Sequence, residues 1–153
     1  MKTKTVDSVA VICATEKLTV PEIGKWSKLI SPLIDAEVEK YNLQKNGPWI
    51  FISFGRDGNI ATKCKVDFCL PIKNCTGYKG ALKIMTLAPF CCAYIEYKGN
   101  MSAKMLGGLG YDPLVQSIRE SGKKFTGESR EVYTKWISNR SKDNEFEIQF
   151  GII

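Results

Sequence analysis

Residues 128–137, ESREVYTKWI, have the composition of a half-buried β-strand with one residue that does not fit it. Val132, Tyr133 and Trp136 are of the β-branched and aromatic types that strands favour. Glu131 stands among them, and a carboxylate within an aromatic strand must be solvated, paired with a cation or used by a ligand. The segments around this strand decide which of these roles is available.

The strand at 128–137 is one segment of a pattern that the sequence contains twice. In the first half, a strand, a helix and two strands are expected at residues 9–15, 19–41, 49–54 and 62–72. In the second half, the same order is expected at residues 90–98, 101–122, 128–137 and 145–153. Aligning the sequence with itself at an offset of about eighty residues matches Glu16 with Glu96 and Gly47 with Gly127.

This repetition predicts an α+β fold made of two pseudo-symmetric βαββ halves. We expect antiparallel sheet with helices on one face, since an amphipathic helix must bury its apolar stripe against a sheet. The seam between the halves is then the natural place for a ligand cleft. At 153 residues, the chain is expected to form a single small-molecule binding domain over residues 1–153.

The two helices differ in regularity. Thr19 as N-cap with Glu22 three residues later is the pattern of a capping box, and it predicts a regular first helix. Its expected apolar stripe consists of Ile23, Trp26, Ile30, Leu33, Ile34, Val38 and Tyr41. GGLG at 107–110 interrupts the second helix, and Asp112 resembles a fresh N-cap. The glycine spacing matches no phosphate-binding motif, so it predicts a break or a close helix–sheet approach.

Composition excludes several kinds of chemistry. The chain has no histidine, which excludes Ser-His-Asp and Cys-His nucleophile systems and His-ligated metals. Its six cysteines form no CxxC pair, so we expect neither a zinc site nor a disulfide, and a reducing cytoplasm as the location. The net charge of +6 is scattered, which argues against direct nucleic-acid binding, and no apolar run is long enough for a membrane span.

Two of the predicted strands carry an acid beside a tyrosine on one face. Because strand residues alternate, Tyr94 and Glu96 share a face of one strand, and Glu131 and Tyr133 share a face of the other. A carboxylate framed by aromatic rings suits a lipophilic cation, which gains cation–π attraction and a countercharge. The alternative is a surface ion pair of Glu131 with Arg130 or Lys135 that contributes little.

Other aromatic and methionine side chains have two possible roles. Trp49 and Phe51 are either sheet core or pocket lining, and Met101 either packs under the sheet or lines an adaptable ligand site. We predict neither a catalytic residue, a metal ligand nor a cofactor. The predicted ligand-binding residues are Glu131, Tyr133, Tyr94, Glu96, Trp49, Phe51, Trp136 and Met101.

The order of these motifs resembles the GyrI-like family, which includes the AraC-type effector-binding domains of Rob and the multidrug-binding domain of BmrR. The motifs are VDFCLPI, then AYIEYKG, a helix, REVY and a final EIQFGI. The resemblance implies a cleft that takes hydrophobic, often cationic, compounds against a buried glutamate, and Glu131 stands at the matching position. Asn100-Met101 replaces the aromatic residue that the family commonly has after the glycine, which implies a wider or softer pocket.

The resemblance also implies what the chain does. Without a preceding helix-turn-helix, it is similar to stand-alone gyrase-inhibitor-like proteins and to drug-binding proteins of integron cassettes. We therefore expect a non-catalytic protein that binds lipophilic cationic small molecules. The alternatives are a hydrolase of electrophilic natural products that uses a cleft glutamate, and a protein-binding module whose partner is a separate transcription regulator or DNA gyrase.

Overall fold

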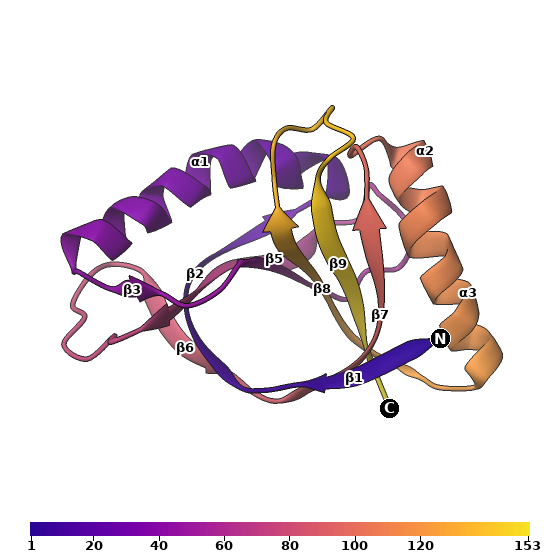
Figure 1. Ribbon diagram of the computed structural model, residues 1–153, viewed down its shortest axis with the longest axis horizontal. Coiled ribbons are helices and arrows are strands. Elements are labelled where there is room, and N and C mark those ends of the chain that lie inside the picture. The colour runs from indigo at the N-terminus through magenta and orange to yellow at the C-terminus, as the bar shows by residue number, and fades with distance from the viewer. The chain divides into compact units, whose positions relative to one another are not determined.

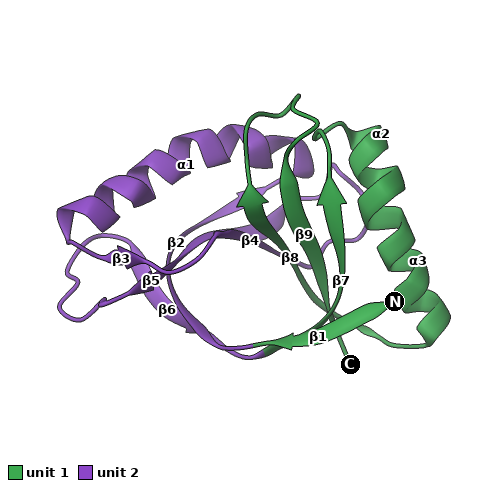
Figure 2. Cartoon of the chain, in the orientation of Figure 1, with its two compact units in different colours: residues 1–6, 90–153 green, residues 7–89 purple.

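The computed structural model describes residues 1–153, which divide into two units. Unit 1 contains residues 1–6 and 90–153, and unit 2 contains residues 7–89 (Figure 2). Each unit combines antiparallel strands with a helical segment, so the expected α+β class is confirmed. None of the helices combines the length and the apolar character that crossing a membrane requires.

Unit 2 is built on a sheet in the order β4-β5-β2-β6, with the short strand β3 paired to β5. Its elements along the chain are β2 (Val9–Leu18), α1 (Val20–Lys40), β3 (Gln44–Lys45), β4 (Trp49–Phe54), β5 (Cys64–Lys73) and β6 (Lys83–Leu87). The buried side of α1 presents Ile30, Ile34 and Val38 to apolar residues of β2 and β5. This cluster forms the core of the unit.

The start of α1 follows the sequence prediction, whereas its apolar stripe is narrower than predicted. The Thr19 backbone N–H donates to the Glu22 carboxylate over 2.9 Å, which completes the predicted capping arrangement. Leu33 is 63% exposed, so its inclusion in the buried stripe was wrong. Residues spaced by four along α1 face the sheet, and Leu33 falls to the side of that line.

Unit 1 is built on a sheet in the order β1-β7-β9-β8. Its elements are β1 (Lys2–Val6), β7 (Phe90–Lys98), α2 (Ala103–Leu106), the π-helix η1 (Gly107–Tyr111), α3 (Asp112–Ser121), β8 (Phe125–Lys135) and β9 (Glu145–Ile152) (Figure 1). One face of the sheet carries Ala93, Tyr97, Phe146, Ile148 and Ile152, and these pack with Leu114 and Ile118 of α3 into a second core.

Of the two alternatives predicted for the glycines at 107–110, the structure shows the close helix–sheet approach, since a Cβ at Gly110 would lie 2.7 Å from Cδ1 of Ile148. GGLG does not break the helix, since residues 103–121 remain helical and residues 107–111 widen into a π-turn. The expected N-cap at Asp112 is wrong, because its backbone is helical at φ −61° and ψ −48°. The helix ends at Gly122, as predicted, and the φ of 75° at this residue is the left-handed conformation that favours glycine.

Both units contain the predicted order of strand, helix, strand and strand, and each adds strands that the sequence pattern did not indicate. β1 (KTKTV) contains a single apolar residue, Val6, and pairs only with β7. β6 pairs only with β2. Both are five-residue strands, and so short a segment gives a weak sequence pattern. The pseudo-symmetry of the two halves stays a prediction.

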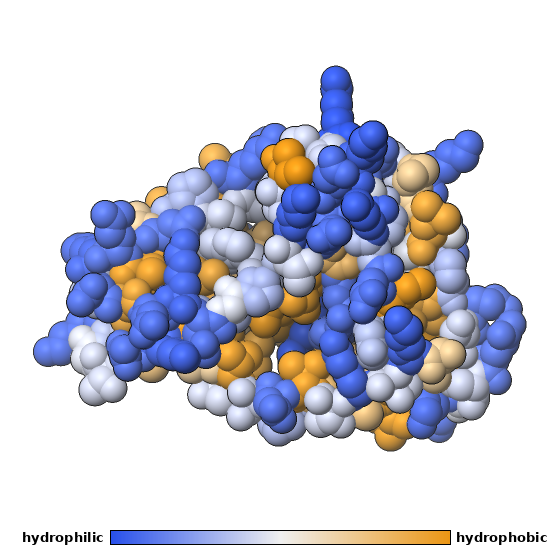
Figure 3. Space-filling model, viewed as in Figure 1, coloured by the Kyte–Doolittle hydropathy of each residue, from blue (hydrophilic) through white to orange (hydrophobic).

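The surface is mainly hydrophilic on the face shown in Figure 3, with apolar groups in separate patches. Several large apolar side chains of unit 1 are exposed, and they lie on the helical segment and after β8. They are Met105, Leu109, Trp136 and Ile137.

Candidate functional site

The pairing of β8 with β9 decides which way Glu131 faces. Glu131 lies opposite Ile148, and Tyr133 lies opposite Phe146. Both partners belong to the core that α3 covers, so Glu131 and Tyr133 lie on the helix side of the unit 1 sheet. Both side chains are half-buried.

The carboxylate of Glu131 accepts a hydrogen bond from a tyrosine on each oxygen. Tyr111, the last residue of η1, donates its hydroxyl to Oε1, and Tyr133 donates its hydroxyl to Oε2. Hydrogen bonds to an ionised acceptor are among the stronger ones in proteins, and here they fix the carboxylate plane between two rings. Arg130 pairs instead with Glu128, at 2.7 and 2.8 Å, so the surface pair of Glu131 with Arg130 is not formed.

Aromatic rings surround this carboxylate. The Tyr133 ring lies 5.0 Å from Phe146 and stands edge-on to Trp136 at 5.7 Å, and the Tyr111 ring stands edge-on to Phe150 at 5.9 Å. Trp136 is 47% exposed, so the aromatic group reaches from the core to the surface. We call Glu131, Tyr111, Tyr133 and Trp136 the acid–aromatic site.

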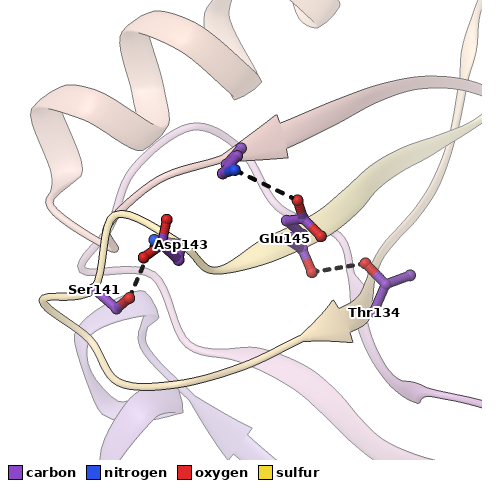
Figure 4. A network of polar contacts seen from close by, with 5 residues as sticks. Thr134, Ser141, Asp143 and Glu145 are labelled. Carbon is purple, nitrogen blue, oxygen red and sulfur yellow. Dashed lines mark hydrogen bonds and ion pairs between the residues drawn. The ribbon is translucent and has the colours of Figure 1, made fainter.

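The loop after β8 is tied down beside this site. Asn144 is fully buried, accepts from the Ile137 N–H over 2.9 Å and donates to the Ser138 carbonyl over 2.6 Å. At the base of the same hairpin, the Thr134 hydroxyl donates to the Glu145 carbonyl over 2.9 Å (Figure 4). These bonds hold the segment that carries Trp136.

Met101 is connected to the same loop. Its backbone N–H donates to the Asn139 carbonyl over 2.9 Å, and its side chain packs against the core of unit 1. Tyr97, which lies under this region, donates its hydroxyl to the Asn100 carbonyl over 2.5 Å, and burial raises the pKa of this tyrosine.

Within unit 1, the structure does not bring Tyr94 and Glu96 to this group. Tyr94 and Glu96 lie on the opposite face of β7, because they pair with Gln149 and Glu147 of β9. The ammonium of Lys4 stands over the Tyr94 ring at 4.2 Å. Glu96 is also exposed. The four residues predicted to lie close together therefore divide between two faces of one sheet: Glu131 and Tyr133 on the helix side, and Tyr94 and Glu96 on the other.

Trp49 and Phe51 belong to unit 2. Both pack against the core under α1, and the Phe51 ring lies 4.8 Å from Phe68 in an edge-on arrangement. Each is partly buried there. Their place in the core agrees with the first of the two roles considered for them.

Tyr111 was not among the predicted residues, although the sequence carries a signal for it. Tyr111, Leu114 and Ile118 follow the i, i+3, i+7 spacing of one helix side, and Tyr111 is the member of that stripe with a polar end. A buried tyrosine hydroxyl requires a partner, and the acid in the next strand supplies it.

Sequence comparisons identify no relative: no family model and no curated protein matches the chain. Comparison with solved structures finds proteins of the same fold. The EcmrR C-terminal domain superposes with a TM-score of 0.81 at 20% identity, over 99% of this chain and 96% of that one. SAV2435, solved bound to tetraphenylphosphonium, superposes with a TM-score of 0.69 at 13% identity, over 99% and 93%. A hydrolase from Listeria innocua superposes with a TM-score of 0.67 at 8% identity, over 99% of this chain and 91% of the hydrolase.

These likenesses show the fold. The expectation drawn from the GyrI-like resemblance is therefore confirmed at the level of architecture, over nearly the whole chain.

Proposed function

We propose that this chain is a small-molecule binding protein that takes hydrophobic, cationic, drug-like compounds against Glu131. The observation that carries the proposal is the Glu131 carboxylate, held by the hydroxyls of Tyr111 and Tyr133 on the helix side of the sheet. It is a negative charge in a half-buried aromatic setting, with no cationic side chain among its hydrogen-bond partners.

A lipophilic cation satisfies each part of this setting. Its charge is attracted to the carboxylate, and the partly dry surroundings strengthen that attraction relative to water. Its apolar groups bury against the rings of Tyr133 and Trp136, whose faces also attract positive charge. A neutral compound of the same shape gains only the apolar contact, so charge provides the discrimination.

Two structural relatives support this proposal. SAV2435 has the same fold and was solved with tetraphenylphosphonium, a lipophilic cation without hydrogen-bond donors. EcmrR carries the fold as a C-terminal domain, and it was also solved in a complex with DNA. A separate regulator or DNA gyrase as the partner of this chain stays a prediction.

The test compares a cation with a neutral compound of matched shape. Methyltriphenylphosphonium is expected to raise the melting temperature in proportion to the logarithm of its concentration above Kd, because it binds only the folded state. Triphenylphosphine oxide is expected to shift the melting temperature much less. Equal shifts for the two compounds would remove charge from the mechanism.

Hydrolysis of electrophilic compounds is the second candidate, and a specific observation favours it: a Listeria innocua hydrolase shares the fold. In that case the Glu131 carboxylate would act as general base on water. Both of its oxygens already accept tyrosine hydrogen bonds, and this arrangement favours binding over base catalysis. Release of a diol from a lipophilic epoxide by the wild-type protein, and its loss in Glu131→Gln, would establish the hydrolase.

A further inference from the structure

We propose that Tyr111 determines which kind of cation the acid–aromatic site prefers, and that Gly110 is the residue that positions Tyr111. The preferred kind is a cation without N–H donors, such as a quaternary ammonium or a phosphonium, over a protonated primary amine. This inference rests on the proposed binding function and adds to it the specificity of the same site.

The π-turn brings the residues before and after it onto one side of the helical segment. The Asp112 backbone N–H bonds to the carbonyl of Gly107, five residues back, in place of the four-residue step of an α-helix. Leu106 and Tyr111 are also five residues apart, and both pack against the core of unit 1. In an unbroken α-helix such residues would project about 140° apart. The widened turn therefore keeps Leu106 and Tyr111 on the same buried side.

Gly110 allows this turn to approach the sheet. A Cβ at Gly110 would lie 2.7 Å from Cδ1 of Ile148 and 3.4 Å from Cδ2 of Tyr97. Ile148 is fully buried, so its side chain has little room to move aside. Ile148 is also the register partner of Glu131. Contact between Gly110 and Ile148 thus sets the separation across which the Tyr111 hydroxyl meets the carboxylate.

The two tyrosine hydrogen bonds determine the specificity. Each carboxylate oxygen already accepts a hydroxyl hydrogen, Oε1 from Tyr111 and Oε2 from Tyr133. A primary ammonium gains its extra affinity by donating N–H bonds to a carboxylate, and here it must compete with the tyrosines for those oxygens. A quaternary cation has no such bonds to make, so it keeps its full electrostatic and apolar attraction.

The experiment measures a ratio of affinities. The trimethylammonium and the primary ammonium forms of one naphthylmethyl skeleton are titrated calorimetrically into wild type and Tyr111→Phe at pH 7. Tyr111→Phe keeps the ring and frees Oε1, so the preference is expected to move about tenfold toward the primary ammonium. The trimethylammonium form is expected to change by less than about threefold, because its apolar contact with the ring is retained.

Glycine variants test the positioning role. Gly110→Ala is expected to push η1 from the sheet and to shift the preference as Tyr111→Phe does. Gly108→Ala is the matched control, because an added Cβ there meets nothing within 4 Å, and it is expected to leave the preference unchanged. Ile148→Val removes the contacting Cδ1, so Gly110→Ala combined with Ile148→Val is expected to restore the wild-type preference in part.

The outcomes separate the two proposals. An unchanged affinity ratio in Tyr111→Phe, with both cations still bound, overturns the specificity inference and leaves the binding function standing. A shifted ratio in Tyr111→Phe with an unchanged ratio in folded Gly110→Ala overturns the role of Gly110. Absence of binding by both cations to the wild type overturns the proposed function and the inference with it. Circular dichroism confirms that each variant is folded.

Discussion

Glu131 and Glu96 occupy similar positions in the sequence and opposite positions in the molecule. Each is an acid two residues from a tyrosine in a strand that pairs with β9. Glu131 lies opposite Ile148 and faces η1, whereas Glu96 lies opposite Glu147 and is exposed. An acid beside a tyrosine in a strand therefore does not define a site by itself. The helix that covers one face of the sheet makes the difference.

Burial varies across the sheet face that carries Glu96. Arg130 is only 4% exposed, pairs with Glu128 and stands 3.8 Å over the ring of Phe90. Cys92 on the same face is buried as well. The face is therefore closed around Arg130 and open around Glu96, and the following predictions test this contrast with the helix side.

The largest expected effect concerns the adjacent thiols Cys91 and Cys92. Cys91 is exposed, whereas burial raises the pKa of the Cys92 thiol to about 11 from an ordinary value of 9.0. Below pH 9, the thiolate fraction of Cys92 is therefore about a hundredfold smaller than that of an ordinary thiol. We expect maleimide to label Cys91 in the folded protein at pH 8 and Cys92 only after unfolding, as peptide mass spectrometry would show.

The sign of the associated pH effect follows from the direction of the shift. Because the folded-state pKa of Cys92 lies above the unfolded value, the stability from its neutral thiol is present below pH 9. It is lost as the pH rises from 9 towards about 11. The Cys91→Ser variant isolates Cys92 in both measurements. Equal labelling rates of Cys92 with and without denaturant would show that this part of the face is open.

The next effect compares the two acids directly. Glu131→Gln is nearly isosteric and removes the charge, so it is expected to weaken binding of methyltriphenylphosphonium about ten- to hundredfold, or about 1–3 kcal/mol. Glu96→Gln is the matched control and is expected to change the binding free energy by less than about 0.5 kcal/mol. Titration calorimetry at low and high salt measures both, since a solvated acid loses its effect in salt.

Two other results of the same titrations would contradict the comparison. Unchanged affinity in Glu131→Gln with a large loss in Glu96→Gln would mean that the open face binds the ligand. Unchanged affinity in both variants would exclude the carboxylate mechanism altogether.

The smallest effect concerns the surface ion pairs on the Glu96 face. Lys4 and Glu147 are 2.5 Å apart with side chains 36% and 17% exposed, whereas Lys98 and Glu145 are 3.8 Å apart and 61% and 46% exposed. Lys98→Ala is expected to change the free energy of unfolding by less than about 0.5 kcal/mol, and Lys4→Ala by up to about 1 kcal/mol. Urea denaturation of both variants checks this order, and a larger loss in Lys98→Ala would reverse it.

Features that depend on neighbouring residues could be predicted from the sequence. Runs of apolar and aromatic residues placed strands at 49–54 and 90–98 with their observed bounds, and the Thr19–Glu22 spacing marked the start of α1. Strand periodicity also put Glu131 and Tyr133 on one face together. These features follow from local geometry, in which the period of the chain fixes which side chains point the same way.

Which face of the unit 1 sheet carries the candidate site depends on strand pairing and helix packing. Strand alternation gave Tyr94 with Glu96 and Glu131 with Tyr133 as equal candidates, and the pairing of β7 and β8 with β9 placed them on opposite sides. The contact of Tyr111 with Glu131 joins residues twenty positions apart through a π-turn whose packing depends on Gly110. Register and helix packing arise from contacts between distant segments, and local periodicity carries no information about them.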